Sequence, residues 1–392
     1  MIPRRELFAS AAALGLGATL LGTAGLTTAD AFTIAKIPAR RASYGPNGTH
    51  WPANTPKSGH ATVLRVACTW AAIGRAIAGV TASQAAGGVL IRVANGTLPG
   101  GTVLQNLGSA SWSKNVLVTP ENGWGTVTIR DTATIRNVRG VTFARLNAHH
   151  IRLIDCSRTN WAQSKLTLGM RTYAESTAVT QCNSYEVVMP VSKADPTDPF
   201  SYAASRGGSI SNCLWEGCYG AAVFRPVGSS AHLDTFQMFG DGSYRGLTIR
   251  DSIFFGGNNC GLQIGGSSTA DPARGTDFLV LDHSMVLSQA MSVRTRYKLP
   301  SGASGGGSQA INGAGEPWQL SAINSSYVLG SMHVTQWKRI ADSYTSHSRA
   351  VTGNPARTGR WAYQSSLESL SASQLDSMSP TPTDAYLSSI WK

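Results

Sequence analysis

The sequence predicts an all-β solenoid, a single-stranded parallel β-helix, because one pattern of strands and turns repeats along the chain. Three segments carry this pattern: Gly207–Arg225, Gly246–Gly266 and Asp277–Arg294. In each, alternating apolar residues lead to an Asp, Asn or His, and a turn of small residues leads to a second apolar triplet. A period of about 20 to 50 residues is typical of solenoids, whose units cannot bury an apolar face alone. The segments are too short and glycine-rich for helices, so we expect strands.

Within these strands, alternate apolar residues should point into a common core. We expect six of them to be buried: Phe236, Met238, Ile249, Ile253, Leu262 and Ile264. The composition agrees with this architecture, since 42 glycines, 17 prolines and 14% charged residues suit stacked strands joined by tight turns. The six cysteines show no C-x-x-C pair and no zinc-type spacing, so we expect them to stack inward or to form one or two disulfides.

Residues 1–31 have the pattern of an export signal. They begin with Arg4-Arg5, continue through an apolar stretch rich in alanine and glycine, and end at the small-x-small pattern Ala29-Asp30-Ala31. This combination predicts a twin-arginine signal peptide, a mature protein that starts at Phe32, and a secreted or periplasmic location. After processing we expect no stable membrane anchor. An uncleaved anchor is the alternative, because about 20 apolar residues can span a bilayer.

The chain is cationic, with 33 Lys and Arg against 21 Asp and Glu, a formal charge of +12. An exported cationic protein favours polyanionic partners, such as an acidic polysaccharide or a cell-wall polymer. Nucleic acid is not expected as a partner, because no recognised binding motif accompanies the charge. We expect a polysaccharide partner and a monomer.

Before the repeats, residues 32–69 form a polar lead-in without periodicity. An amphipathic helix follows, with Trp70, Ile73, Ile77 and Val80 at helical spacing, and we expect it to cap the open end of the solenoid. The chain then continues as a strand and an N-G-T turn through Gly87–Leu98.

This succession resembles the entry of the pectate-lyase-like right-handed parallel β-helix superfamily. The resemblance covers about residues 70–329 and implies a right-handed coil, but it specifies architecture far better than activity. We expect the coil to occupy residues 70–335 and residues 336–392 to form a C-terminal packing segment and tail. Longer excursions are expected at Lys193–Ser205, Ser267–Thr276 and Leu299–Glu316, of which Ser301–Gly315 should be a mobile loop.

One exposed face is the candidate functional site. Gln237 and Gln263 are 26 residues apart, a plausible single coil, so they should stack on the outside if their neighbours point inward. Continuing the register places Ser292 over Gln263 and brings Arg294 alongside. His232 and Asp234 precede the first strand, although by parity they could also point inward.

The cationic excess and the shortage of carboxylates favour a polysaccharide lyase or a related uronate-acting enzyme, in which the sugar carboxylate must be neutralised while a base removes the adjacent proton. We therefore expect Arg294 to neutralise the carboxylate, His232 to exchange the proton and Asp234 to orient His232. Further substrate contacts are expected from a short segment and the glutamine pair: Arg296, Tyr297, Lys298, Gln237 and Gln263.

Two other functions stay open. A glycoside hydrolase needs two carboxyl groups about 5 to 9.5 Å apart, for which Asp234 and Asp241 are the available pair. A non-enzymatic adhesin or phage-spike-like carbohydrate-binding protein would need no catalytic group. No metal site is assigned, although the loops at Asp195–Asp198 and Asp271–Asp277 could hold Ca²⁺.

Overall fold

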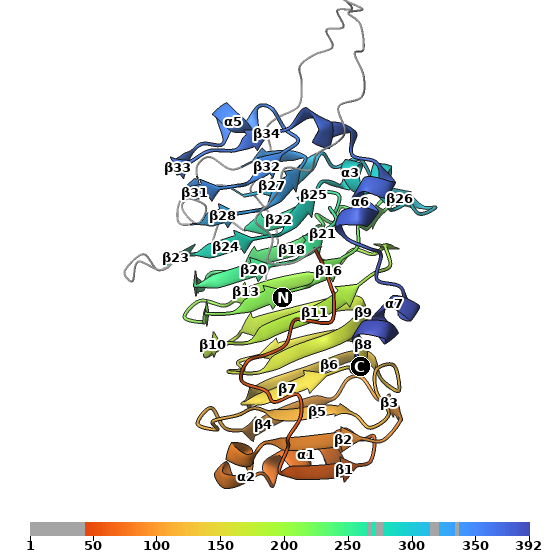
Figure 1. Cartoon of the computed structure of the whole chain (residues 1–392), viewed down its shortest axis with the longest axis vertical. Coiled ribbons are helices and arrows are strands. Elements are labelled where there is room, and N and C mark those ends of the chain that lie inside the picture. The colour runs from red at the N-terminus through yellow and green to blue at the C-terminus, as the bar shows by residue number, and fades with distance from the viewer. Residues whose placement is uncertain (1–43, 265–268, 271–276, 314–320, 334–336) are drawn as a thin grey trace, which may run out of the picture. The chain divides into compact units, whose positions relative to one another are not determined.

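The computed structural model describes residues 44–264, 269–270, 277–313, 321–333 and 337–392. The expected signal peptide and most of the Ser267–Thr276 excursion lie outside the described residues. So does the first part of the lead-in. Every strand pairing in the two long sheets of the described chain is parallel, and each coil pairs with the next one along the chain (Figure 1). The predicted right-handed parallel β-helix is therefore the architecture of this protein.

Sheet A contributes two short strands from most coils, with a bend between them. Its strands are β1 (Thr62–Val66), β2 (Val89–Val93), β5 (Val116–Pro120), β7 (Val141–Ala144), the first part of β9 (Asn160–Ala174), β11 (Asn183–Met189), β15 (Leu214–Glu216), β16 (Tyr219–Gly220), β20 (Leu247–Arg250), β21 (Ile253–Phe254), β24 (Leu279–Asp282), β25 (Met285–Leu287), β28 (Ala322–Asn324), β29 (Tyr327–Leu329), β31 (Trp337–Ala341), β32 (Tyr344–Thr345), β33 (Ala356–Gly359) and β34 (Ala362–Tyr363).

Sheet B forms another side of the coil. Its strands are β3 (Gly96–Leu98), β4 (Val103–Gly108), β6 (Val127–Arg139), β8 (Asn147–Ile154), the last part of β9, β13 (Phe200–Ala204), β18 (Asp234–Phe239), β22 (Cys260–Ile264), β27 (Gln309–Asn312) and β30 (Ser331–His333). Two predicted excursions thus contain coil strands: β13 lies within Lys193–Ser205, and β27 lies within the expected mobile loop. Polar and small residues flank both strands, and they hid the short apolar triplets from the sequence pattern.

Two small sheets and several short helices complete the fold. The small sheets are β10 (Ala178–Thr180), β14 (Ser209–Ser211), β19 (Ser243–Arg245) with β23 (Thr269–Ala270), and β12 (Lys193–Ala194), β17 (Val223–Pro226) with β26 (Ala303–Ser304). The helices are α1 (Trp70–Ala78), α2 (Ala82–Gly87), α3 (Gln289–Thr295), α5 (Ala350–Gly353), the 3₁₀ helix η2 (Ser365–Ser369), α6 (Ala372–Met378) and α7 (Asp384–Ile390).

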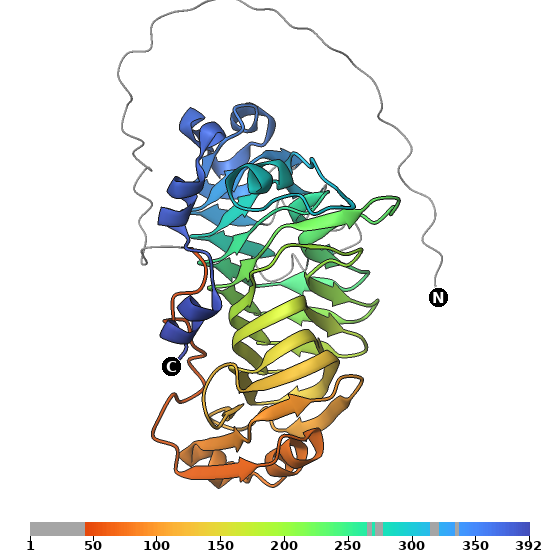
Figure 2. The ribbon, with the colours of Figure 1, turned by 90° about the vertical axis from the view of Figure 1, so that its right-hand side faces the viewer.

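Helix α1 spans Trp70–Ala78 and buries Trp70, Ile73 and Ile77, whereas Val80, which its spacing also assigned to the helix, follows the Gly79 cap. Thr69 caps it by accepting from the Ala72 N–H. The parallel coil is longer than the expected 70–335, because it begins with β1 and continues through β34. Beyond it, α6 and α7 run back along the coil (Figure 2).

The core contains the six apolar residues expected there. Phe236, Met238, Ile249, Ile253, Leu262 and Ile264 each have at most 1% of their surface exposed. Phe236 packs edge to face against Trp215, with ring centroids 5.0 Å apart. All six cysteines are unpaired thiols, and five are buried, so the inward-stacking alternative is confirmed over disulfides.

The bend of sheet A stacks one residue per coil in the left-handed backbone conformation. This bend ladder, in register order, is Arg145, Gln163, Glu186, Gly217, Asp251, His283, Ser325 and Asp342. This register differs from the alignment of the repeat Gly207–Arg225 with the repeat Gly246–Gly266 that the sequence pattern predicts. Leu214 pairs with Thr248, so Gly217, rather than Asn212, occupies the position of Asp251.

Candidate functional site

The outer surface of sheet B carries one continuous ladder of polar side chains, which we call the sheet B face. Its members, in register order, are Arg152, Arg171, Ser201, Gln237, Gln263, Asn312 and His333. The predicted stacking of Gln237 on Gln263 is confirmed, with Phe236 over Leu262 and Met238 over Ile264 beside it. The inward neighbours of both glutamines are buried, which leaves the two amides on the outside.

The register predicted beyond Gln263 is wrong. Asn312 of β27, rather than Ser292, pairs with Gln263. Residues 289–295 form helix α3 because Ser288 caps it, accepting from the Met291 N–H at 3.2 Å. Arg294 lies exposed in the last turn of that helix, and its Nη2 contacts Met291 Sδ at 2.9 Å. It is therefore not part of the sheet B face.

The segment after α3 binds the C-terminal part of the chain. Arg296 donates to Tyr219 Oη at 2.9 Å and to Asp376 Oδ1 at 2.6 Å. The Tyr297 hydroxyl, which is buried, lies 2.6 Å from the Tyr219 hydroxyl. These contacts are internal, whereas Lys298 is exposed. The expected substrate contacts of Arg296 and Tyr297 thus fall on side chains that hold the fold together.

Asp234 is buried beneath the sheet B face rather than exposed on it. Its side chain is fully buried, and Oδ1 accepts from Asn259 Nδ2 at 2.6 Å and from Cys260 Sγ at 3.0 Å. In the orientation that satisfies both groups, the Gln263 amide nitrogen donates to Asp234 Oδ2 at 2.9 Å. Burial, and next the nearby Asp198, raise the pKa of Asp234 to about 8. Asp234 is therefore mostly protonated at neutral pH.

His232 lies above this buried carboxyl group at the edge of the face. Its side chain is 59% exposed, and Nδ1 is 3.9 Å from Asp234 Oδ2. Partial burial lowers the pKa of His232, so the neutral imidazole is the main form at pH 7. The proximity of these two residues agrees with the sequence prediction. At 3.9 Å, however, the contact is too long for a hydrogen bond through which Asp234 would orient the imidazole.

The predicted hydrolase pair is not brought together. Asp234 begins β18, and Asp241 follows the end of that strand at Phe239. An extended strand rises about 3.3 Å per residue, so the two backbones are on the order of 15 Å or more apart, well beyond a glycosidase pair.

The N-terminal part of the sheet B face is basic. Lys193 Nζ donates to Leu168 O at 3.1 Å and lies 3.9 Å from Asp195 Oδ1, and its side chain is 16% exposed. Burial lowers its pKa to about 8. Lys193 also lies close enough to His150 to act on it electrostatically, together with Arg152 and Arg171.

His150 itself is held neutral. Burial, and next Arg152 and Arg171, lower the pKa of His150 to about 3. Lys193 and Arg171 were missed by the sequence analysis, because an insertion before β13 lengthens this coil and Lys193 lies in that insertion. The step of 30 residues from Arg171 to its partner Ser201 is longer than the 26-residue step from Gln237 to Gln263, and this extra length was the available sign of an insertion.

A hollow adjoins this basic region. It has a volume of about 480 Å³ and is lined by Thr97, Thr128, Ile129, Arg130, Asp131, Asn147, Ala148, His149, Lys165 and Thr167. His149, in its wall, directly precedes His150. The hollow extends the polar surface toward the N-terminal coils.

The carboxylates of the Asp195–Asp198 loop accept hydrogen bonds from backbone N–H groups of the loop and of β18. Asp195 Oδ1 accepts from the Thr197 N–H at 2.9 Å, and Asp198 Oδ1 accepts from the Asp234 N–H at 2.9 Å. This loop needs no Ca²⁺ to explain its carboxylates. The Asp271–Asp277 loop lies almost entirely outside the described residues.

No family model and no curated protein matches the chain. Among solved structures it is similar to Geobacillus virus E2 ORF18, with 10% identity and a TM-score of 0.38 over 76% of this chain and 61% of that one. It is also similar to the PL6 family alginate lyase AlyGC, with 12% identity and a TM-score of 0.38 over 70% of this chain and 40% of that one. The chain thus spans less than two thirds of either structure.

A third similar structure is the A-module of the Azotobacter vinelandii mannuronan C-5 epimerase AlgE4. The identity is 13% and the TM-score 0.26, over 75% of this chain and 92% of that one. At these TM-scores, the activities of the three proteins do not carry over to this chain. Among the described residues, no helix is long and apolar enough to span a membrane.

Proposed function

We propose that the sheet B face binds an acidic polysaccharide and cleaves it by β-elimination. One observation carries the proposal: the largely buried Lys193 and the stacked Arg152 and Arg171 all act electrostatically on His150, and Gln237 and Gln263 stack farther along the same sheet. Two arginines stacked on successive coils suit the repeated carboxylates of a polyuronate, and the formal charge of +12 favours its approach.

The residues divide the chemistry between them. Arg171 neutralises the uronate carboxylate, which makes the proton on the adjacent carbon C5 acidic. Neutral Lys193 removes that proton, the electron pair forms the C4–C5 double bond, the C4–O4 bond breaks, and O4 takes a proton from solvent. A lysine with a pKa of about 8 has a substantial neutral fraction at mildly alkaline pH. Gln237 and Gln263 hydrogen-bond to sugar hydroxyl groups.

His232 is the second candidate for the base, because its neutral imidazole is exposed at the edge of the same face. Substituting each base separately distinguishes them. If Lys193 is the base, Lys193→Ala abolishes cleavage and His232→Ala weakens it only slightly.

A hydrolytic mechanism has less support. Asp234 has no exposed side-chain surface, and Asp241 lies beyond the opposite end of β18. A non-enzymatic carbohydrate-binding protein would use the same polar face without Lys193 chemistry. A panel of uronate-containing and neutral polysaccharides separates the three functions. Elimination gives ultraviolet absorbance from the unsaturated ends, hydrolysis gives reducing sugar alone, and a binding protein gives neither.

We propose further that the protein is exported by the twin-arginine route. The support is Arg4-Arg5 with Ala29-Asp30-Ala31. Replacing both arginines by lysine should leave the precursor in the cytoplasm, whereas the native protein should be recovered outside with Phe32 at its N-terminus. Unchanged secretion of the double variant would contradict this route.

A further inference from the structure

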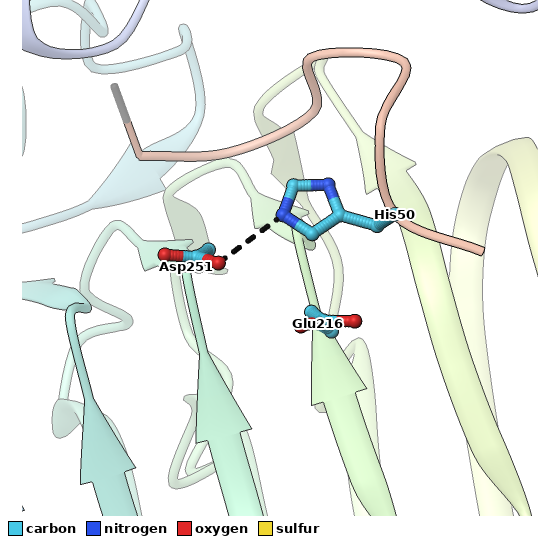
Figure 3. Close-up of side chains that lie close together, drawn as sticks. All are labelled: His50, Glu216 and Asp251. Carbon is cyan, nitrogen blue, oxygen red and sulfur yellow. Dashed lines mark hydrogen bonds and ion pairs between the residues drawn. The ribbon is translucent and has the colours of Figure 1, made fainter. Parts of the chain in front are cut away.

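The bend ladder of sheet A lacks a side chain at Gly217, and His50 fills the gap. A Cβ at Gly217 would clash with the His50 ring, because the imidazole lies directly over that glycine. His50 comes from the lead-in segment, which crosses the coil there (Figure 3). The imidazole thus lies in the ladder between Glu186 and Asp251, which belong to the coils on either side.

The two ring nitrogens of His50 have different partners. Nδ1 lies 2.6 Å from Glu186 Oε1, and Nε2 lies 3.4 Å from Asp251 Oδ2. Glu216 is the third member of this cluster, and one ligand atom from each of His50, Glu216 and Asp251 lies within 4.8 Å of the others (Figure 3). All three residues are buried.

This arrangement has the form of a metal centre with its supporting shell. A metal-binding histidine generally donates its second ring N–H to a carboxylate, which fixes the tautomer and points the other nitrogen at the metal. Glu186 Oε1 is placed to accept such a bond from His50 Nδ1–H. On the other side, His283 Nδ1 bonds to Asp251 Oδ1, which leaves Oδ2 facing His50.

The charges also call for a cation. Glu186, Glu216 and Asp251 bring three carboxylates into a buried region. Arg250 lies beside them: its Nη1 is 3.8 Å from Glu216 Oε1, while its Nε donates to Asp282 at 2.9 Å. Imidazole protons on His50 and His283, or a bound ion, can add to this compensation, because buried charges require partners.

We propose that His50, Glu216 and Asp251 bind a divalent transition-metal cation such as Zn²⁺. One imidazole nitrogen and two carboxylates suit Zn²⁺, Co²⁺ or Mn²⁺ better than Ca²⁺, which takes six to eight oxygen ligands. Zinc ligands lie about 2.0–2.2 Å from the ion, so the three groups need to draw together by about 1 Å. The ion ties the lead-in segment at His50 to the two successive coils that carry Glu216 and Asp251.

The test measures metal binding and stability without reference to catalysis. The purified full chain is stripped with a chelator and titrated with Zn²⁺ by calorimetry, and Co²⁺ is added separately to record its visible absorption. We expect about one equivalent of Zn²⁺ and a rise in the melting temperature. Co²⁺ should show ligand-field bands of a low-coordinate nitrogen and oxygen site.

Variants locate the site. Glu216→Gln and His50→Gln should abolish stoichiometric binding, and Glu186→Gln should weaken it by about 10- to 100-fold as a supporting residue. Glu121→Gln, which removes a carboxylate paired with Arg65 at the surface, is the matched control and should bind as the native chain does. If His50→Gln fails to fold, Glu216→Gln still decides the question.

Two results would overturn the proposal. One is a native chain that binds none of these ions and melts at the same temperature with and without them, which would leave protons as the charge compensation. The other is binding that survives in folded Glu216→Gln, which would place the ion elsewhere. Neither result bears on cleavage at the sheet B face, so the two proposals fail separately.

Discussion

Two polar ladders follow the coil, and they differ in what covers them. The sheet B face is largely open to solvent, with Ser201 as a buried member, whereas the central part of the bend ladder of sheet A, from Glu186 to His283, is buried beneath the lead-in and the C-terminal segment. The same stacking geometry thus serves two purposes. An open ladder can meet a repeating polymer, whereas a covered one must satisfy its charges within the protein.

The largest expected effect tests the core on which both ladders depend. Ile264→Asp should prevent folding, because a carboxylate at a position 1% exposed would be left unpaired among apolar side chains. The control Thr248→Asp places the same charge on a half-buried outward position of β20 and should fold. Circular dichroism and thermal melting compare them. A soluble Ile264→Asp protein with native melting would contradict the assignment of inside and outside.

The next prediction removes the chemistry from the open ladder. Lys193→Ala should lower the rate of cleavage by about 10²-fold or more, as expected for the loss of a general base, with little change in melting temperature. Lys338→Ala, which removes a lysine paired with Asp277, should keep full activity. The rate of appearance of unsaturated ends is the measurement. If the Lys193→Ala protein stayed active, another residue would have to be the general base.

A third variant, Arg296→Ala, distinguishes a structural role of Arg296 from a role in substrate binding. Arg296→Ala removes hydrogen bonds to Tyr219, Asp376 and the Ser379 carbonyl, and should cost about 1–3 kcal/mol of unfolding free energy. Denaturant unfolding and proteolysis of the C-terminal segment measure this loss. The KM for the polymer should stay unchanged in the folded fraction. A raised KM with native stability would restore Arg296 as a substrate contact.

The last prediction concerns pH. The folded-state pKa of Asp234 is about 8, against an ordinary value of 3.8, so between these values the folded protein binds more protons than the unfolded chain. Its contribution to stability therefore falls as pH rises from about 4 to about 8. Asp234→Asn, which keeps the shape without the charge, should flatten the melting temperature over this interval. An unchanged pH profile would show that Asp234 is ionised in the folded protein.

The sequence was sufficient for the architecture because inward positions repeat. Ile249, Leu262 and Ile264 alternate with polar residues, and that alternation follows directly from strand geometry. The 26-residue step from Gln237 to Gln263 was predictable for the same reason. The predicted strand register was wrong where a coil changes length. A helix and a loop separate β25 from β27, and the sequence does not show how many residues they add to the coil.

The candidate site was predictable only in part. The stacked glutamines and nearby His232 could be found, since they lie on or before one regular strand. Lys193 could not, because it lies in an insertion that no periodicity describes. His50 was hidden for another reason: its partners Glu186 and Asp251 are 136 and 201 residues away in sequence, and their meeting depends on a segment that folds back over the coil.

Glu186 has a topological consequence for how the protein comes apart. It receives hydrogen bonds from the Asn47 backbone near the start of the described chain and from the Trp391 indole at the next-to-last residue. A solenoid whose repeats contact only their neighbours can fray from either end. Here Asn47 and Trp391 both bond to a middle coil, so separating an outer coil from its neighbour leaves the chain between them closed on itself. We therefore expect the protein to unfold in one cooperative transition, as a closed ring would, rather than unravelling coil by coil.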